Sequence, residues 1–262
     1  MSAAGAILSV SRNAYREAIR DRILFSLLFF AVLMVGAAVL FSQMSFGIAA
    51  DSLINFSLAA ITLLGVIIAV FLGNQLVSKE IERRTLYTLL AHPVRRTHFL
   101  LGKFAGLVWT LVVNCGLMGV ALFLALLYVL PAHVVAGEWS LLAALYFILL
   151  ALAVLTAIAL LFSCFASPVL AAVFTLALFV IGNFDDNLRA LGESSRQWLG
   201  GHLAIWISYV LPNFGDFNVA TAASHFMPIG WRLIGLNTLY AVVYCGVALA
   251  IAGAIFENKD LK

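Results

Sequence analysis

The sequence is poor in charged residues and in cysteine. Lys, Arg, Asp and Glu make up 10% of its 262 residues, and hydrophobic residues make up 64%. A water-soluble domain carries about 25% charged residues, so this composition excludes an ordinary soluble protein. The three cysteines show neither a disulfide framework nor a metal-binding spacing such as C-x-x-C. A net charge of +3, without a basic stripe alternating with aromatic residues, gives no indication of nucleic-acid binding.

Several enzyme motifs are also missing. A phosphate-binding loop has the pattern G-x-x-x-x-G-K-[ST], but Gly102 and Lys103 are followed by Phe104, and Thr97 stands where the first glycine belongs. Neither H-E-x-x-H nor G-x-S-x-G occurs, which excludes the most recognisable membrane-protease and hydrolase patterns. We therefore expect no ATP hydrolysis by this chain and assign no catalytic residue.

What the sequence has in abundance is long apolar runs. A bilayer core about 30 Å thick needs about 20 apolar residues in a helix, and backbone groups in lipid must bond within their own segment. The sequence therefore predicts an all-α polytopic membrane protein with a single transmembrane domain. A shorter apolar stretch at 198–211 has the length of a re-entrant or interfacial helix within an outer segment at 185–231. The six predicted spans are 24–41, 56–77, 101–130, 141–165, 169–184 and 233–256.

The basic residues lie mostly on one side of such a six-span topology. Four stand in the N-terminal arm, six between residues 79 and 103, and two in the C-terminal tail, which makes twelve of the fifteen. The other side holds Arg189, Arg196 and Arg232, while the twelve acidic residues divide evenly. The positive-inside rule then predicts that both termini and the basic loop at 78–100 are cytoplasmic.

The N-terminal arm, residues 1–22, has the pattern of an amphipathic helix. A basic stripe on one face and an apolar opposite face suit a helix that lies along the inner membrane leaflet and contacts lipid. A basic arm that only fixes the topology is an equally open interpretation. The apolar face comprises Ile7, Val10, Ala14 and Ala18, and the stripe comprises Arg12, Arg16 and Arg20.

The loop at 78–100 combines charged residues with an apolar patch. Glu80 and Arg84 have the acid-first spacing of four residues that supports a helix. Lys79 and Arg83 are their neighbours, and Leu86, Leu89 and Leu90 follow one turn later. A short helix that is too charged for lipid yet exposes leucines indicates docking on another protein. The alternative is a basic turn that merely sets topology.

At these residues the sequence resembles a known family. The order Lys79-Glu80-Ile81-Glu82-Arg83-Arg84-Thr85-Leu86, then Leu89-Leu90-Ala91-His92-Pro93-Val94, then Phe99-Leu100-Leu101-Gly102-Lys103, is similar to the signature of ABC type-2 transporter permeases between spans two and three. Leu211-Pro212-Asn213-Phe214 before the last span and the tail after Phe256 add to the resemblance.

The resemblance implies a membrane subunit of an ATP-driven exporter in a prokaryotic plasma membrane, the inner membrane in a Gram-negative cell. The loop would be a coupling helix that fits a separate ATP-hydrolysing subunit, with two permeases and two such subunits in the complex. This chain would bind no cofactor, because ATP and Mg belong to the partner. The residues expected at the contact are Lys79, Glu80, Glu82, Arg83, Arg84, Thr85, Leu86, Leu89 and Leu90.

The polar residues near the middle of the predicted spans are uncharged. Asn114, Thr156 and Asn237 could line a translocation path, although hydrogen bonding between helices is the more ordinary role of such residues, as for Thr175 and Thr238. No Asp, Glu or His stands near mid-membrane, which argues against an ion-coupled secondary transporter or channel. A span set without buried charge hints at a lipid-like or amphipathic cargo.

The outer segment contains acidic and histidine residues, but they show no convincing ligand spacing, so no metal site is predicted. A membrane component of a protein or metalloenzyme maturation system is the remaining alternative, although the five methionines form no cluster suited to copper transfer.

Overall fold

The computed structural model describes residues 3–20, 49–82, 96–129, 139–184 and 211–258, together with six positions between 29 and 40. Within these residues the structure is helical and contains no strand. The helices are α1 (Ala3–Arg20), α3 (Ala49–Glu82), α5 (Arg96–Val129), α7 (Trp139–Ser163), α8 (Pro168–Asn183), the short 3₁₀ helix η1 (Gly215–Phe217), α11 (Ala220–Ser224) and α12 (Trp231–Asn258).

Four described helices are long and apolar enough to cross a membrane, with apolar parts at Ala50–Asn74, Thr97–Val129, Trp139–Ser163 and Trp231–Phe256. This confirms the prediction of an all-helical membrane protein and the helical nature of four predicted runs. The run at 169–184 corresponds to α8, which has 16 residues. Only six positions of the span predicted at 24–41 and one of the helix predicted at 198–211 are described, so the count of six spans stays a prediction.

Three helices are longer than the runs that predicted them. Helices α3 and α5 each have 34 residues and α12 has 28, because each continues past its apolar run into polar residues. Helix α8 begins where the sequence says it should: Pro168 occupies its first turn, and Ser167 before it has an extended backbone.

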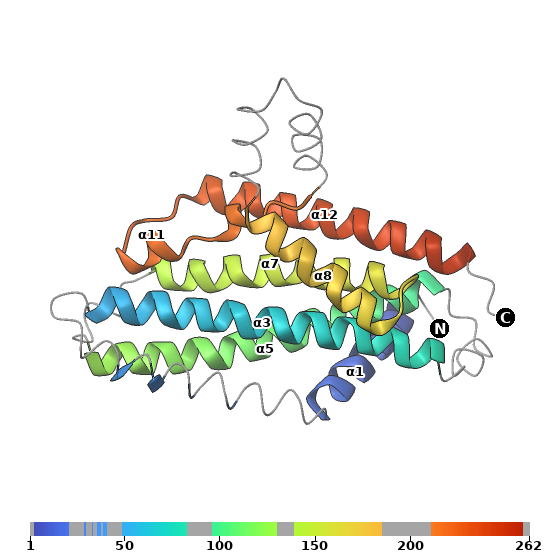
Figure 1. Ribbon diagram of the computed structural model, residues 1–262, viewed down its shortest axis with the longest axis horizontal. Coiled ribbons are helices and arrows are strands. Elements are labelled where there is room, and N and C mark those ends of the chain that lie inside the picture. The colour runs from blue at the N-terminus through green and yellow to red at the C-terminus, as the bar shows by residue number, and fades with distance from the viewer. Residues whose placement is uncertain are drawn as a thin grey trace, which may run out of the picture.

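Helix α7 is the centre of the molecule. Sixteen of its 25 residues are buried, and it contacts α3, α5, α8 and α12. Figure 1 shows α3, α5 and α7 running side by side, with α12 along the opposite edge of α7. The outer faces of the surrounding helices remain apolar and exposed, as expected where lipid replaces water as the solvent. On α12 this face includes Leu236, Leu239, Val242, Val243, Val247 and Ile251.

The helix ends that adjoin the basic segments lie together at one end of the bundle. Figure 1 places α1, the last turns of α3 and α12 and the first turns of α5 at the same end. There the Phe99 and Phe256 rings stack with centroids 6.5 Å apart. At the other end, the Trp139 and Trp231 rings lie 5.5 Å apart. The arrangement agrees with a topology in which the basic segments share one side, which we call the basic end.

Two glycines allow α1 to lie directly against α5. A Cβ added at Gly102 would come 2.6 Å from the Cβ of Val10, and one at Gly106 would come 2.7 Å from the Cβ of Ala14. Ala14 is fully buried in this contact. The Gly102-x-x-x-Gly106 spacing, which is common where helices approach closely, therefore serves close packing. Helix α5 covers the Ala14 side of the arm, and the placement of the arm along the inner leaflet stays a prediction.

The contact between α1 and α5 yields a matched test. We expect Gly106→Ala to destabilise the protein by about 1–3 kcal/mol, because the new methyl group meets the Ala14 side chain and the Ser11 carbonyl oxygen. Gly116→Ala, on the same helix, is the control, since a Cβ there meets nothing within 4 Å. Thermal unfolding in detergent measures both. Equal melting temperatures for the two variants would contradict the close contact.

Candidate functional site

The charged run after the second predicted span begins as a continuation of that span. Helix α3 passes without a break through Lys79 and Glu80 to Glu82. No glycine or proline occurs between Asn74 and His92, so nothing in the local sequence ends the helix earlier. The side chains of these three charged residues are not described. The remaining predicted contact residues lie outside the described residues: Arg83, Arg84, Thr85, Leu86, Leu89 and Leu90.

The length of α3 places its charged end beyond the apolar part. A helix of 34 residues is about 51 Å long, whereas a bilayer core is about 30 Å thick. The apolar part ends at Asn74, which leaves about two helical turns before Glu82. The first residues of the predicted coupling segment are thus a rigid projection of a membrane-embedded helix.

An ion pair between a buried lysine and an exposed glutamate joins α1 to α5 at the same end. Lys103 is only 1% exposed, and its Nζ atom lies 3.3 Å from the Glu17 Oε2 atom. The ammonium also lies 5.5 Å from the centre of the Phe99 ring. A buried ammonium is costly without a partner, so the pair favours one position of α1 on α5. From the sequence, Lys103 was counted as a topology signal and its ion pair was missed. The neighbouring Gly102 and Gly106 could have indicated that another helix packs closely at this position.

The basic stripe of the arm faces away from this contact. Arg12 and Arg16 are exposed on α1, on the side opposite the buried Ala14 and Ala18. Arg20 is the last residue of α1, and its side chain is not described. The exposed guanidinium groups are free to meet an anionic surface.

The three residues predicted to line a path lie on three different helices. Asn114, Thr156 and Asn237 are buried on α5, α7 and α12. Each donates a hydrogen bond to a carbonyl oxygen four residues earlier in its own helix, at 3.0, 2.7 and 3.3 Å. The bonds seen for these residues therefore run within their own helices and not between helices as expected, and the buried Asn114 Oδ1 atom has no hydrogen-bond partner among the described residues. Their part in a path stays a prediction.

Thr175, like the three path residues, donates its hydrogen bond to a carbonyl oxygen of its own helix. Two other polar groups do bond between elements. The hydroxyl groups of Tyr146 on α7 and Thr238 on α12 lie 2.8 Å apart, which confirms the expected role of Thr238. The backbone N–H of Asn213 donates to the Tyr240 hydroxyl at 3.0 Å. These bonds fix α12 to α7 and to the segment that precedes it.

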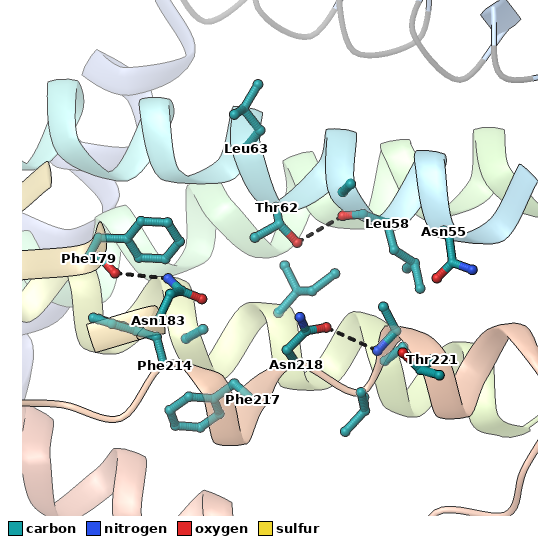
Figure 2. A pocket seen from close by; sticks show the side chains of 16 residues that line it. Asn55, Leu58, Thr62, Leu63, Phe179, Asn183, Phe214, Phe217, Asn218 and Thr221 are labelled. Atoms are coloured by element: carbon teal, nitrogen blue, oxygen red, sulfur yellow. Dashed lines mark hydrogen bonds between the residues drawn. The ribbon is translucent and has the colours of Figure 1, made fainter. Parts of the chain in front are cut away.

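A cavity of about 440 Å³ lies in the half of the bundle opposite the basic end. Figure 2 shows α3 along one wall and the η1–α11 segment along the other, with side chains of α8 between them. We call this space the outer cavity. One face of α3 forms the first wall, with lining residues at helical spacing. Residues of α7 form the floor, and η1 and α11 form the second wall. The α3 residues are Asn55, Leu58, Ala59, Thr62 and Leu63.

Close packing on α8 positions the second wall. A Cβ at Gly182 would collide with the Pro212 carbonyl oxygen, so only glycine permits this approach. The Phe214 N–H donates to the Gly182 carbonyl oxygen at 3.0 Å, and the Phe179 and Phe214 rings lie 5.1 Å apart. The Leu-Pro-Asn-Phe motif thus holds the cavity wall on α8.

The outer segment offers no metal site in the part that the structure describes. No group of three His, Cys, Asp or Glu side chains gathers among the described residues. Of the acidic and histidine residues considered from the sequence, Asp216 and His225 are described and exposed.

Comparison with known proteins agrees with this architecture. The model of the family described as "ABC-2 family transporter protein" matches residues 8–185, more than half of the chain. The protein named "Probable ABC transporter permease protein NosY" from Pseudomonas aeruginosa is 30% identical over 284 aligned residues, which cover 97% of this chain and 99% of that protein. The match includes the arm, α3, the basic loop and the central helices. This chain belongs to the ABC-2 transporter family and is a membrane permease subunit of an ABC transporter.

Proposed function

We propose that this permease is the transmembrane half of an exporter driven by a separate ATP-hydrolysing subunit, which binds the basic end. The observation that carries the proposal is the unbroken helix α3, which joins the membrane-embedded bundle to the charged run. An ABC permease works with an ATP-binding subunit, and the charged residues at 79–86 are the part of this chain that resembles the family's contact with it. ATP and Mg would be bound by that partner.

The coupling mechanism follows from the rigid elements. Closure of the ATP-hydrolysing subunits would push the projecting end of α3, and α3 would transmit the displacement to the helices around α7. ATP can shift the spans only through contacts that differ between the two states. The ion pair of Lys103 and Glu17 makes α1 and α5 move together. Two permeases, paired with two ATP-hydrolysing subunits, complete the working unit in this proposal.

The proposed location is the plasma membrane of a prokaryote, the inner membrane in a Gram-negative cell. The excess of Lys and Arg at the basic end supports a cytoplasmic position for that end and for both termini. There the exposed Arg12 and Arg16 would meet anionic lipid headgroups.

ATP-driven transport is preferred to ion-coupled transport. Among the described residues, the buried polar side chains are uncharged except for Lys103, which lies at the basic end and is paired with Glu17. An ion-coupled transporter keeps its ionisable residues near mid-membrane. Copurification distinguishes the two functions, since an ATP-binding subunit should accompany this chain only in the first case.

The first functional prediction concerns coupling. We expect Glu82→Ala and Leu86→Ala each to lower the ratio of transport to ATP hydrolysis by about tenfold, the effect of losing a contact of about 1.4 kcal/mol. Transport into vesicles and phosphate release by the reconstituted complex measure this ratio. Asp216→Ala is the control, since Asp216 is exposed at the opposite end. If both variants retain the normal ratio, the assigned contact is wrong.

The second functional prediction concerns sidedness. We expect a membrane-impermeant maleimide to label Met227→Cys in intact cells, and to label Lys79→Cys only after the membrane is opened. Met227 is 56% exposed at the end opposite α1, and the native Cys115, Cys164 and Cys245 are buried, which keeps their background labelling low. Labelling of Lys79→Cys from outside intact cells would invert the topology and remove the basis for a cytoplasmic motor.

A further inference from the structure

The outer cavity lies apart from the charged run proposed to bind the motor subunit, and its lining is entirely uncharged. Five polar side chains face it, and the other lining residues are alanine, valine, leucine, isoleucine and phenylalanine. A charged ligand would lose its hydration there without meeting a counter-charge. The volume of about 440 Å³ lies within the range of about 300–1,000 Å³ common for small-molecule sites. The polar lining residues are Asn55, Thr62, Asn183, Asn218 and Thr221.

Two amides present hydrogen-bond acceptors to the cavity. The Asn55 Nδ2 group donates to the backbone oxygen and to Oδ1 of Asp51, each at 3.1 Å. The Asn183 Nδ2 group donates to the Phe179 carbonyl oxygen at 2.9 Å, as Figure 2 shows. Because both bonds engage the amide nitrogen, they leave the Oδ1 atoms of Asn55 and Asn183 as acceptors. The two acceptors come from different walls, α3 and α8.

The second wall presents a donor. The Asn218 Oδ1 atom accepts the Ala220 backbone N–H at 3.2 Å, so among the described residues the Nδ2 group remains as a donor. On α3, the Thr62 hydroxyl donates to the Leu58 carbonyl oxygen at 2.8 Å and keeps its own lone pairs. A hydroxyl group both donates and accepts, so a molecule with several hydroxyls satisfies these groups together.

The apolar part of the lining reaches the surface of the bundle. Ala59 and Leu63 line the cavity and are also exposed on α3, within the part of that helix apolar enough to cross a membrane. Phe56, on the same side of α3, is exposed as well. A hydrocarbon chain could therefore leave the cavity along α3 without crossing polar groups.

We propose that the outer cavity binds an uncharged amphiphile whose hydroxyl-bearing headgroup lies among the amides and whose hydrocarbon chain follows the apolar wall of α3. The Asp51 carboxylate, bonded to Asn55 one turn away, disfavours an anion at the polar end. This site goes beyond the proposed coupling function, because binding requires neither ATP nor a motor subunit. It names the class of molecule that this half of the permease recognises at its outer side.

Photo-crosslinking of the purified full-length chain in phosphatidylcholine nanodiscs tests the site. The probe is a monoacylglycerol carrying a diazirine in its acyl chain, and the comparison probes are a fatty acid and an alkyltrimethylammonium with the same diazirine chain. We expect the neutral probe to label peptides containing residues 55–63 or 214–221 about tenfold more than the charged probes do. Equal labelling by the anionic or cationic probe, or labelling spread over the lipid-facing helices, would overturn the proposal.

Variants test the polar contacts. Combining Thr62→Val with Asn183→Leu should lower labelling by the neutral probe roughly three- to tenfold, because two ligand-facing groups are lost. Thr175→Val is the matched control: Thr175 makes the same bond to its own helix at 2.7 Å but does not line the cavity. Unchanged labelling in the double variant would contradict the site.

A blocking variant keeps the test decisive if the double variant unfolds. Ala59→Phe narrows the cavity from an exposed position, so the core need not repack. We expect it to reduce labelling at 214–221 as strongly as the polar double variant, with an unchanged melting temperature. Full labelling in a folded Ala59→Phe protein would overturn the proposal. No motor subunit is present in these experiments, so their failure would not contradict the proposed export function. Failure of the coupling experiments would likewise not contradict binding in the outer cavity.

Discussion

The contact between α1 and α5 is the constraint on which the basic end depends. Two glycines bring the helices together, and the ion pair of Lys103 and Glu17 fixes their relative position. A buried ammonium whose carboxylate partner stands on another helix makes displacement of that helix costly. The N-terminal arm is therefore part of the packed bundle, and a force applied to α1 reaches the third predicted span directly.

Helix α3 connects the two regions of functional interest. Its first half lines the outer cavity, and its last two turns begin the charged run that resembles the family's motor contact. Because a helix transmits displacement along its axis, a movement at Lys79 is also a movement of the wall that contains Asn55 and Thr62. In the proposed mechanism, this single element links ATP hydrolysis at one end with the shape of the cavity at the other.

The sequence predicted the parts of this structure that depend on local patterns. Long apolar runs gave the helices, and the ordered residues from Lys79 to Lys103 gave the family. The sequence could not show that Lys103 is buried, since that depends on where Glu17 of a distant helix lies. Nor could it show that Asn114 and Thr156 bond within their own helices. The outer cavity was missed because its lining comes from four separate segments, whose meeting depends on the close approach of Pro212 to Gly182.

The central claim is that the projecting end of α3 binds an ATP-hydrolysing subunit. The most direct measurement places a photo-reactive amino acid at position 79, and in a second protein at position 227, and cross-links each with the ATP-binding subunit present. We expect an adduct with that subunit at position 79 and none at position 227. An adduct at position 227, or none at position 79 in a complex that hydrolyses ATP, would contradict it.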